Sequence, residues 1–170
     1  MAACVLGGVV AYRMRPLVAE KLNGLFPLNL IYSGRKTPTA VAVNQVENSF
    51  ASYPTLYKKI LNAIDTCAQQ GIAAWKSGKR EALGHIMTIQ QGLMQALGVN
   101  TTILQGIVEE LQSMPTVWGA KISGSGLGDS VIALGTLNED YVSCFALQGA
   151  KRIPMMIATE GVRDEKNGCC

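Results

Sequence analysis

Residues 121–135, KISGSGLGDSVIALG, place three glycines within five positions and then continue into an apolar, β-branched run. A dinucleotide-binding fingerprint needs G-x-G-x-x-G at the start of a helix, whereas this stretch has G-x-G-x-G followed by a strand pattern. A Walker A loop needs a lysine after its last glycine, and Asp129 occupies that position. The stretch therefore disfavours a Rossmann fold and rules out a P-loop.

The remaining prediction for this stretch is a β-hairpin with a glycine loop, formed by strands near 117–122 and 130–135. Glycine allows positive φ angles and lets a ligand approach the main chain closely. Two interpretations stay open at this point. The loop either binds a ligand or is a glycine-rich hairpin turn that binds nothing.

The length of 170 residues predicts one domain over residues 1–170, large enough to bury a core without disulfides or metal. Hydrophobic residues make up 48% and charged residues 16%, as in an ordinary globular protein. The net charge is +3, the basic residues are dispersed and aromatics are 6%, so we expect no nucleic-acid partner. The apolar run at residues 1–12 is too short to cross a bilayer, so we expect no membrane partner either.

The five cysteines are odd in number and lack metal-ligand spacing, which indicates reduced thiols and a cytoplasmic protein. The terminal pair, Cys169 and Cys170, resembles a prenylation tail, and the alternative is a frayed end. We recognise no targeting signal at the amino terminus.

Hydrophobic periodicity predicts helices in the middle of the chain, because apolar residues recur at three- and four-residue steps from Leu56 to Trp75 and again from Leu83 to Leu97. The expected helices cover Pro38 to Ser49 with Thr37 as cap, Pro54 to Gly78, Leu83 to Gly98, a stretch capped by Thr101 or Thr102 and ending near Ser113, and Asn138 to Gln148. The expected strands are Val5 to Arg13 (buried), Pro27 to Tyr32, Val117 to Ile122, Ser130 to Gly135 and Arg152 to Thr159.

This order of elements predicts an α+β fold. It favours a ferredoxin-like sandwich, in which an antiparallel sheet has helices packed on one face. The expected order is an early strand, helices, two paired strands, a helix and a returning strand.

Several stretches resemble the carboxy-terminal domain of the GHMP small-molecule kinases, and its mevalonate kinase branch in particular. AKISGSGLGDSVIAL is similar to the third motif of the family, a glycine loop between two strands whose main chain helps to shape the phosphate site. QQGLMQALGVN, LIYSGRKTPTAVAV and IATEGVRDE are similar to a helix end, a basic strand-to-turn segment and a closing strand. The resemblance implies ATP and Mg²⁺ as cofactors.

The chain also departs from the family. Leu127 and Asp129 stand where the family loop has glycines, and an acidic residue at the second position is also similar to phosphomevalonate kinases. MAACVLGGVVAYR is similar to the segment in which the aspartate base of the family precedes two glycines, and that aspartate would fall immediately before Met1. The P-x-x-x-G-L-x-S-S nucleotide loop is absent as well. The resemblance therefore implies no catalytic residue in this chain and an amino-terminal kinase domain as its missing partner.

The expected nucleotide and phosphate loop consists of Lys121, Ser123, Gly124, Ser125, Gly126, Gly128 and Asp129. Successive turn amides form an anion-binding nest, so the N–H groups around residues 125–128 can donate to phosphate. Lys121 faces either the phosphates or solvent, and strand alternation does not decide between them. Asp129 either braces the loop through local N–H groups or reaches a metal ion.

The expected substrate-binding group is Arg35, Lys36, Thr37 and Thr39. These residues form a compact cationic and hydroxyl group near a strand end, which suits a carboxylate-bearing substrate such as mevalonate. The alternative is that Thr37 only caps a helix and that both cations are solvated.

We therefore expect the carboxy-terminal half of an ATP-dependent mevalonate kinase, which transfers the γ-phosphate to a hydroxyl of mevalonate in isoprenoid synthesis. One alternative is phosphomevalonate kinase or another GHMP kinase. A second is a non-catalytic module, derived from such a kinase, that associates with itself as a homodimer. The isolated chain is expected to have little or no kinase activity.

Overall fold

The computed structural model describes residues 2–162. The chain divides into two compact units, a larger one formed by Phe26–Pro154 and a smaller one formed by residues 1–25 and 155–170. The single domain expected over residues 1–170 therefore stays a prediction, with two compact units inside it. The expectation for Cys169 and Cys170 lies outside the described residues.

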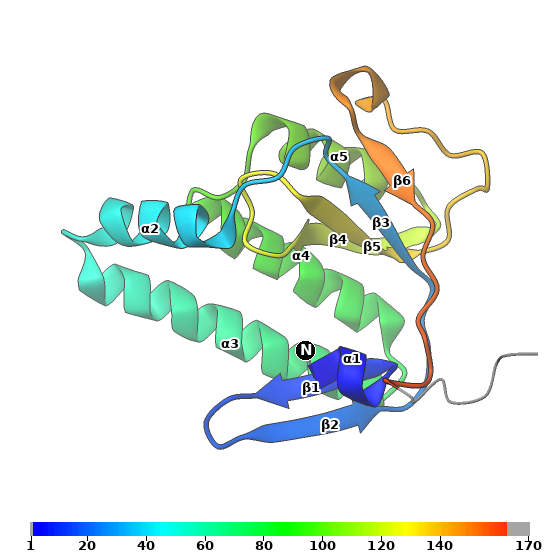
Figure 1. The fold of residues 1–170 in the computed structure, drawn as a ribbon, viewed down its shortest axis with the longest axis horizontal. Coiled ribbons are helices and arrows are strands. Elements are labelled where there is room, and N and C mark those ends of the chain that lie inside the picture. The colour runs from blue at the N-terminus through cyan, green and yellow to red at the C-terminus, as the bar shows by residue number, and fades with distance from the viewer. Residues whose placement is uncertain (1, 163–170) are drawn as a thin grey trace, which may run out of the picture. The chain divides into compact units, whose positions relative to one another are not determined.

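The larger unit contains a four-stranded antiparallel sheet. Its strands are β3 (Leu28–Tyr32), β4 (Val117–Ser123), β5 (Ser130–Gly135) and β6 (Lys151–Ile153). They lie in the order β4-β5-β3-β6, and every neighbouring pair is antiparallel (Figure 1). This arrangement is ferredoxin-like, because β3 is followed by helices, then by the β4–β5 hairpin, and finally by β6, which lies beside β3. The predicted α+β fold class is confirmed.

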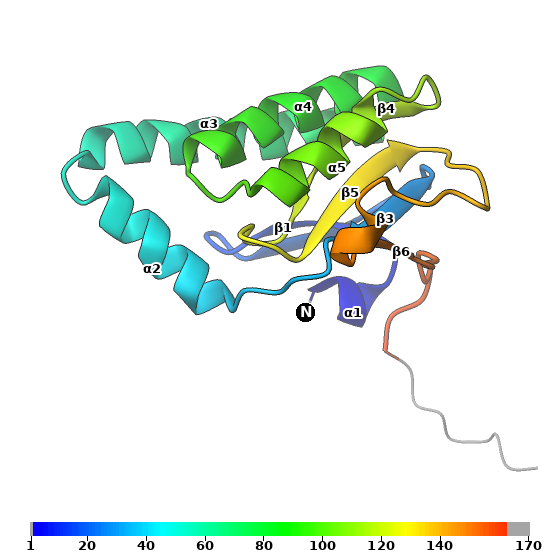
Figure 2. The ribbon, with the colours of Figure 1, turned by 90° about the horizontal axis from the view of Figure 1, so that it is seen from above.

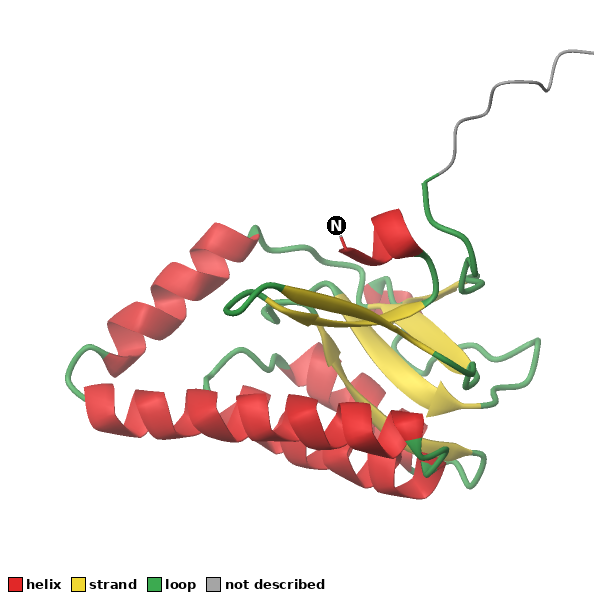
Figure 3. Cartoon of the chain, turned by 90° about the horizontal axis from the view of Figure 1, so that it is seen from below, coloured by secondary structure: helices red, strands yellow, loops and turns green. Residues whose placement is uncertain are grey.

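Four α-helices follow β3 in the larger unit. They are α2 (Thr39–Phe50), α3 (Pro54–Lys76), α4 (Arg80–Ala96) and α5 (Thr102–Gln112). As expected, α3, α4 and α5 lie on one face of the sheet (Figure 2), while α2 meets α3 at an angle (Figure 3). None of the helices within residues 2–162 has the length and apolar character needed to cross a membrane.

The hydrophobic core lies between α5 and the sheet. Leu104, Ile107 and Leu111 are fully buried, because their spacing places them on one face of the helix. They belong to one cluster with Ile31 of β3 and Val131 of β5. The cluster fixes the start of α5 relative to the strands that flank the glycine loop.

The outer edge of β4 is covered by α4. A Cβ atom on Gly84 would lie 2.1 Å from the carbonyl oxygen of Trp118, and one on Gly119 would lie 2.4 Å from the carbonyl oxygen of Gly84. The Ile122 amide donates to Gln91 Oε1 at 2.8 Å, so a side chain from α4 pairs with the edge strand. Covering an edge in this way prevents it from pairing with another chain.

The helix predicted over residues 138–148 is wrong. This fully described segment contains one short 3₁₀ turn, η1 (Ala146–Gln148), and is otherwise irregular. Glu110 of α5 holds it instead, because Ser143 Oγ donates to Glu110 Oε2 at 2.8 Å and the Cys144 amide donates to Oε1 at 3.1 Å. Side-chain hydrogen bonds to the backbone compete with a helical ladder, and here the tertiary contact prevails.

The last predicted strand, Arg152 to Thr159, is also shorter than expected. Strand β6 ends at Ile153 and is followed by Pro154, which has no N–H to continue the ladder. The described part of the stretch IATEGVRDE forms no strand, and its end lies outside the described residues.

The smaller unit contains α1 (Ala2–Leu6), β1 (Val9–Arg13) and β2 (Val18–Leu22), with β1 and β2 paired antiparallel. The strand predicted over Val5 to Arg13 is correct from Val9 onward, but Val5 and Leu6 belong to α1 instead. Its predicted burial is wrong, since β1 is half-buried at its start and exposed at its end. Strand β2 was not predicted, because its run VAEKL is short and carries adjacent opposite charges.

Candidate functional site

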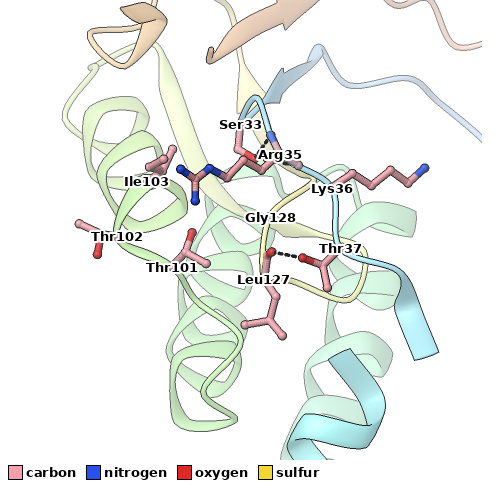
Figure 4. Close-up of a pocket in the computed structure, with 9 residues that line it drawn as sticks. All are labelled: Ser33, Arg35, Lys36, Thr37, Thr101, Thr102, Ile103, Leu127 and Gly128. Carbon is pink, nitrogen blue, oxygen red and sulfur yellow. Dashed lines mark hydrogen bonds between the residues drawn. The ribbon is translucent and has the colours of Figure 1, made fainter. Parts of the chain in front are cut away.

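A cavity of about 550 Å³ opens where the glycine loop meets the segment after β3 and the start of α5 (Figure 4). The lining residues are Ser33, Arg35, Lys36, Thr37, Thr101, Thr102, Ile103, Leu127 and Gly128. Three stretches that are far apart in sequence thus meet at one place. The structure brings most of the predicted substrate group together with one end of the predicted phosphate loop.

The glycine loop, residues 124–129, is built almost entirely from left-handed backbone. The positive φ angles are +90° at Gly124, +77° at Gly126, +58° at Leu127, +121° at Gly128 and +74° at Asp129. Close packing adds a second constraint, since a Cβ atom on Gly126 would lie 2.5 Å from the carbonyl oxygen of Val99. Glycine is therefore required at this position by conformation and by contact.

Hydrogen bonds join the loop to the segment after β3. The Asp129 amide donates to the carbonyl oxygen of Arg35 at 2.6 Å, and the Ser33 amide donates to the carbonyl oxygen of Asp129 at 2.8 Å. Thr37 Oγ1 donates to the carbonyl oxygen of Leu127 at 2.6 Å. The predicted capping role of Thr37 is wrong, since the N-cap of α2 is Pro38 and has no side-chain capping bond. The Thr37 hydroxyl instead holds the glycine loop in place.

The amides of the loop fall into two groups. Those of Leu127 and Asp129 are already used, because they donate to the carbonyl oxygens of Val99 and Arg35. The amides of Gly124, Ser125, Gly126 and Gly128 have no hydrogen-bond acceptor among residues 2–162. The nest predicted over residues 125–128 therefore lacks Leu127 as a donor, and its remaining donors are free.

The two cations of the predicted substrate group point in different directions. Both Arg35 and Lys36 are exposed. Figure 4 shows the guanidinium of Arg35 extending toward the first turn of α5, whereas the Lys36 side chain points away from it. Thr39 is the first residue of α2, is exposed and does not line the cavity. Both cations line the cavity, and Arg35 is the one whose side chain extends toward α5.

The start of α5 is the part of the site that the sequence prediction missed. Thr101 caps the helix, as the Leu104 amide donates to its Oγ1 at 3.3 Å. The amides of Thr102 and Ile103, in the first turn, have no acceptor within the helix. A helix N-terminus with free amides favours an anion. The predicted cap was a usable signal, but the sequence did not show that the cap lies beside Arg35.

Of the predicted loop residues, Gly128 alone is among those that line this cavity, and Lys121 and Ser123 lie on β4. Lys121 is largely buried, and its Nζ donates to the carbonyl oxygen of Ile122 at 2.7 Å. Burial lowers the pKa of this amine below its usual value, because desolvation disfavours the charged form. Ser123 is the last residue of β4 and pairs with Ser130 across the hairpin.

Asp129 lies at the end of the loop with its main chain bonded to Ser33 and Arg35 on either side. Its Oδ1 accepts a hydrogen bond of 3.4 Å from Ser130 Oγ. No group of three or more His, Cys, Asp or Glu side chains within residues 2–162 is arranged to hold a metal ion. Mg²⁺ in phosphoryl-transfer sites is commonly held by one or two carboxylates together with substrate phosphates, and Asp129 offers one such carboxylate.

The arrangement has the chemistry of an anion site. The Arg35 guanidinium, the first turn of α5 with its two free amides, and the glycine loop at Leu127 and Gly128 line one cavity from three directions. Guanidinium groups bind carboxylates and phosphates in bidentate fashion, and main-chain nests complement them.

Comparison with known proteins gives a match to a family model over part of the chain and a similar fold among solved structures. Residues 72–141 match the family model described as GHMP kinases C terminal. No curated protein matches the chain. Among solved structures, the chain is similar to L. major mevalonate kinase in complex with R-mevalonate, with 23% identity and a TM-score of 0.63 over 72% of this chain and 38% of that chain.

Two further solved structures extend the comparison. Methanococcus jannaschii mevalonate kinase is 26% identical, with a TM-score of 0.53 over 70% of this chain and 37% of that chain. Streptococcus pneumoniae phosphomevalonate kinase, in complex with phosphomevalonate and AMPPNP, is 18% identical, with a TM-score of 0.59 over 80% of this chain and 43% of that chain. This chain therefore spans about two fifths of the length of each of these neighbours.

Proposed function

We propose that this chain is the carboxy-terminal half of an ATP-dependent mevalonate kinase, because residues 72–141 match the family model of GHMP kinases C terminal and the fold resembles that of solved mevalonate kinases. The observation that carries the proposal is the convergence of Arg35, the first turn of α5 and the glycine loop on one cavity. This cavity lies in the larger unit, which also contains residues 72–141 that match the family model.

In this proposal, Arg35 and the amides of Thr102 and Ile103 hold the carboxylate of mevalonate. The free amides of the glycine loop face the phosphate being transferred, and Thr37 keeps that loop in position. Lys36 and Thr39 contribute charge and polarity near the entrance. ATP with Mg²⁺ supplies the phosphoryl group, and the residues of this chain position the acceptor and neutralise charge.

Phosphomevalonate kinase is the second candidate function, and Asp129 at the glycine loop is the observation that favours it. Phosphomevalonate carries a phosphate in addition to its carboxylate, and the same set of cationic and amide donors accommodates either anion. The acceptor that supports turnover decides between the two. The third candidate, a non-catalytic module that self-associates, is tested by the activity measurement described next.

The test is to fuse this chain to the amino-terminal half of L. major mevalonate kinase and to measure ADP release. We expect the chain alone to show no turnover, because the donors described here only position anions. We expect the fused protein to turn over with mevalonate, and Arg35→Ala to raise KM for mevalonate by about tenfold or more, since one charge-assisted contact contributes about 1.5–3 kcal/mol.

Lys58→Ala is the matched control, because it removes an exposed cation from α3, away from the cavity. Its KM should stay within about twofold of the unmodified fusion. Robust turnover by the chain alone contradicts the proposed half-enzyme. An Arg35→Ala fusion with unchanged KM contradicts the assigned site, and a fused protein that accepts only phosphomevalonate favours the second candidate.

A further inference from the structure

A second cavity, of about 420 Å³, opens between α5 and the segment after β5. Its lining includes three carboxamides, one carboxylate and one aromatic ring, which belong to Gln95, Asn100, Gln105, Glu109 and Phe145. It shares the first turn of α5 with the cavity beside Arg35, but no lysine, arginine or histidine within residues 2–162 lines it. Its volume is that of a small-molecule site, and its chemistry differs from that of the anion cavity.

The polar side chains of this second cavity form one hydrogen-bonded row. Gln105 Nε2 donates to Glu109 Oε1 at 2.5 Å. Asn100 Nδ2 donates to Gln105 Oε1 and, at 2.5 Å, to Gln95 Oε1. An ionised carboxylate can only accept, so Glu109 fixes which way the Gln105 carboxamide is turned, and Gln105 then fixes the Asn100 carboxamide. Both N–H groups of the Asn100 side chain are therefore used within the row.

The atom that this row leaves over is Asn100 Oδ1. It is buried and has no hydrogen-bond partner within residues 2–162. A buried acceptor without a donor destabilises the folded chain, and buried polar atoms in native proteins are generally paired. The row thus presents acceptors, and the molecule that complements it carries N–H or O–H donors.

The charge of the lining favours a cation. Glu109 is exposed and is negative, with no basic side chain of the described residues beside it in the lining. It lies about two turns and about 10 Å along α5 from Thr102. The positive end of a helix dipole acts within the first turn, so it does not oppose a cation at Glu109.

Phe145 supplies the apolar part of the second cavity. Its ring packs directly on Gly106 of α5, which holds it at the edge of the cavity. Aromatic rings bury the methylene groups of a ligand and attract a cation at their face. An aliphatic amine offers both of these features.

We propose that the second cavity binds an aliphatic amine that carries a second N–H or O–H group. Its ammonium group lies at Glu109, its second donor reaches Asn100 Oδ1, and its methylene groups lie on Phe145. The Gln105 carboxamide and a hydrogen bond of about 3 Å on each side of it separate the two acceptors, so about four carbons link the two donors. This site is distinct from the anion cavity and does not depend on the proposed kinase activity.

The test titrates the full chain with three matched probes, 4-aminobutanol, butylamine and butane-1,4-diol, at about pH 7, where the amines are charged. Nuclear magnetic resonance follows the side-chain amide signals of Gln95, Asn100 and Gln105. We expect 4-aminobutanol to shift these signals with a Kd of about 5 mM or below, as suits a ligand of this size. Butylamine lacks the second donor and should bind at least about threefold more weakly. Butane-1,4-diol lacks the charge and should bind at least about tenfold more weakly.

Glu109→Gln tests the charge from the side of the protein. This variant keeps the size of an exposed side chain and should weaken 4-aminobutanol at least about fivefold. Glu47→Gln is the matched control, because Glu47 is an exposed glutamate of α2 that does not line the cavity. Its affinity should stay within about twofold of that of the unmodified chain.

Four results overturn the inference. They are an absence of shifts at about 50 mM 4-aminobutanol, equal binding of butane-1,4-diol, equal binding of butylamine, and a Glu109→Gln variant that binds like the unmodified chain. The comparison among the probes uses the unmodified chain alone, so it decides the matter even where a variant fails to fold.

Discussion

Gly126 and Gly124 show that the glycines of one loop serve different purposes. Both have positive φ angles, but Gly126 is buried against the carbonyl oxygen of Val99, whereas Gly124 is exposed and a Cβ atom there would meet nothing closer than Asp129 Oδ2 at 3.6 Å. The bare backbone at Gly126 is thus needed by the protein itself. The bare backbone at Gly124 leaves its amide open to a ligand.

Alanine substitutions separate these two roles at the scale of single residues. We expect Gly126→Ala to destabilise the chain by about 3 kcal/mol, because a left-handed conformation costs about 1–2 kcal/mol and overpacking adds about 1–3 kcal/mol. Gly124→Ala should cost about 1 kcal/mol, from conformation alone. Urea unfolding monitored by circular dichroism measures both. Equal losses at the two positions would show that the contact between the loop and Val99 is absent in solution.

At the scale of elements, α4 and β4 depend on one close backbone approach. We expect Gly84→Ala to destabilise the chain by more than about 2 kcal/mol, because its Cβ atom would lie 2.1 Å from the carbonyl oxygen of Trp118. Gly92 lies on the same helix with open space around it, so Gly92→Ala should stabilise the chain by about 0.5–1 kcal/mol through helix propensity. Thermal unfolding of the two variants tests this pair, and a Gly84→Ala variant as stable as Gly92→Ala contradicts the contact.

The irregular segment after β5 depends on Glu110. Hydrogen bonding to this carboxylate raises the pKa of the Cys144 thiol above its ordinary value, and burial together with Glu110 raises the pKa of Tyr141. The folded state therefore favours the neutral forms of Cys144 and Tyr141. Their contribution to the free energy of unfolding is full at a pH below the pKa values of the unfolded state, and it is lost as the pH rises through the pKa values of the folded state.

Removing the Glu110 charge tests the hydrogen bonds that hold this segment. We expect Glu110→Gln to lower the pKa of Cys144 and so to speed its alkylation by iodoacetamide at about pH 8, since the thiolate is the reactive form. Peptide mass spectrometry follows Cys144 against exposed Cys4 as the internal reference. Glu109→Gln, at an exposed neighbouring position, should leave the ratio unchanged. A ratio that is the same in all three proteins shows that Glu110 does not hold the thiol.

At the scale of the whole molecule, the sequence predicted well whatever depends on local pattern. The stripe from Leu56 to Trp75 predicted α3, and the glycine run between apolar segments predicted the β4–β5 hairpin. Predictions failed where distant contacts decide the structure. Thr37 bonds to Leu127, 90 residues away, in place of capping α2, and Glu110 holds the segment that was predicted to be a helix. The contribution of α5 to the site was missed, because Thr101 and Arg35 are far apart in the sequence and come together only when the chain folds.

The bonds from the glycine loop to Val99 and Arg35 have a thermodynamic consequence. The cavity exists only when the start of α5, the β4–β5 hairpin and the segment after β3 are all in place, so an unfolded or partly assembled chain offers no equivalent site. An anion that binds there binds the native state only, and so raises the free energy of unfolding by about 2.7 kcal/mol when its concentration is a hundredfold above Kd. The melting temperature rises as a result. A thermal-shift screen of carboxylates and phosphates thus reports the ligand preference of this cavity without any requirement for turnover.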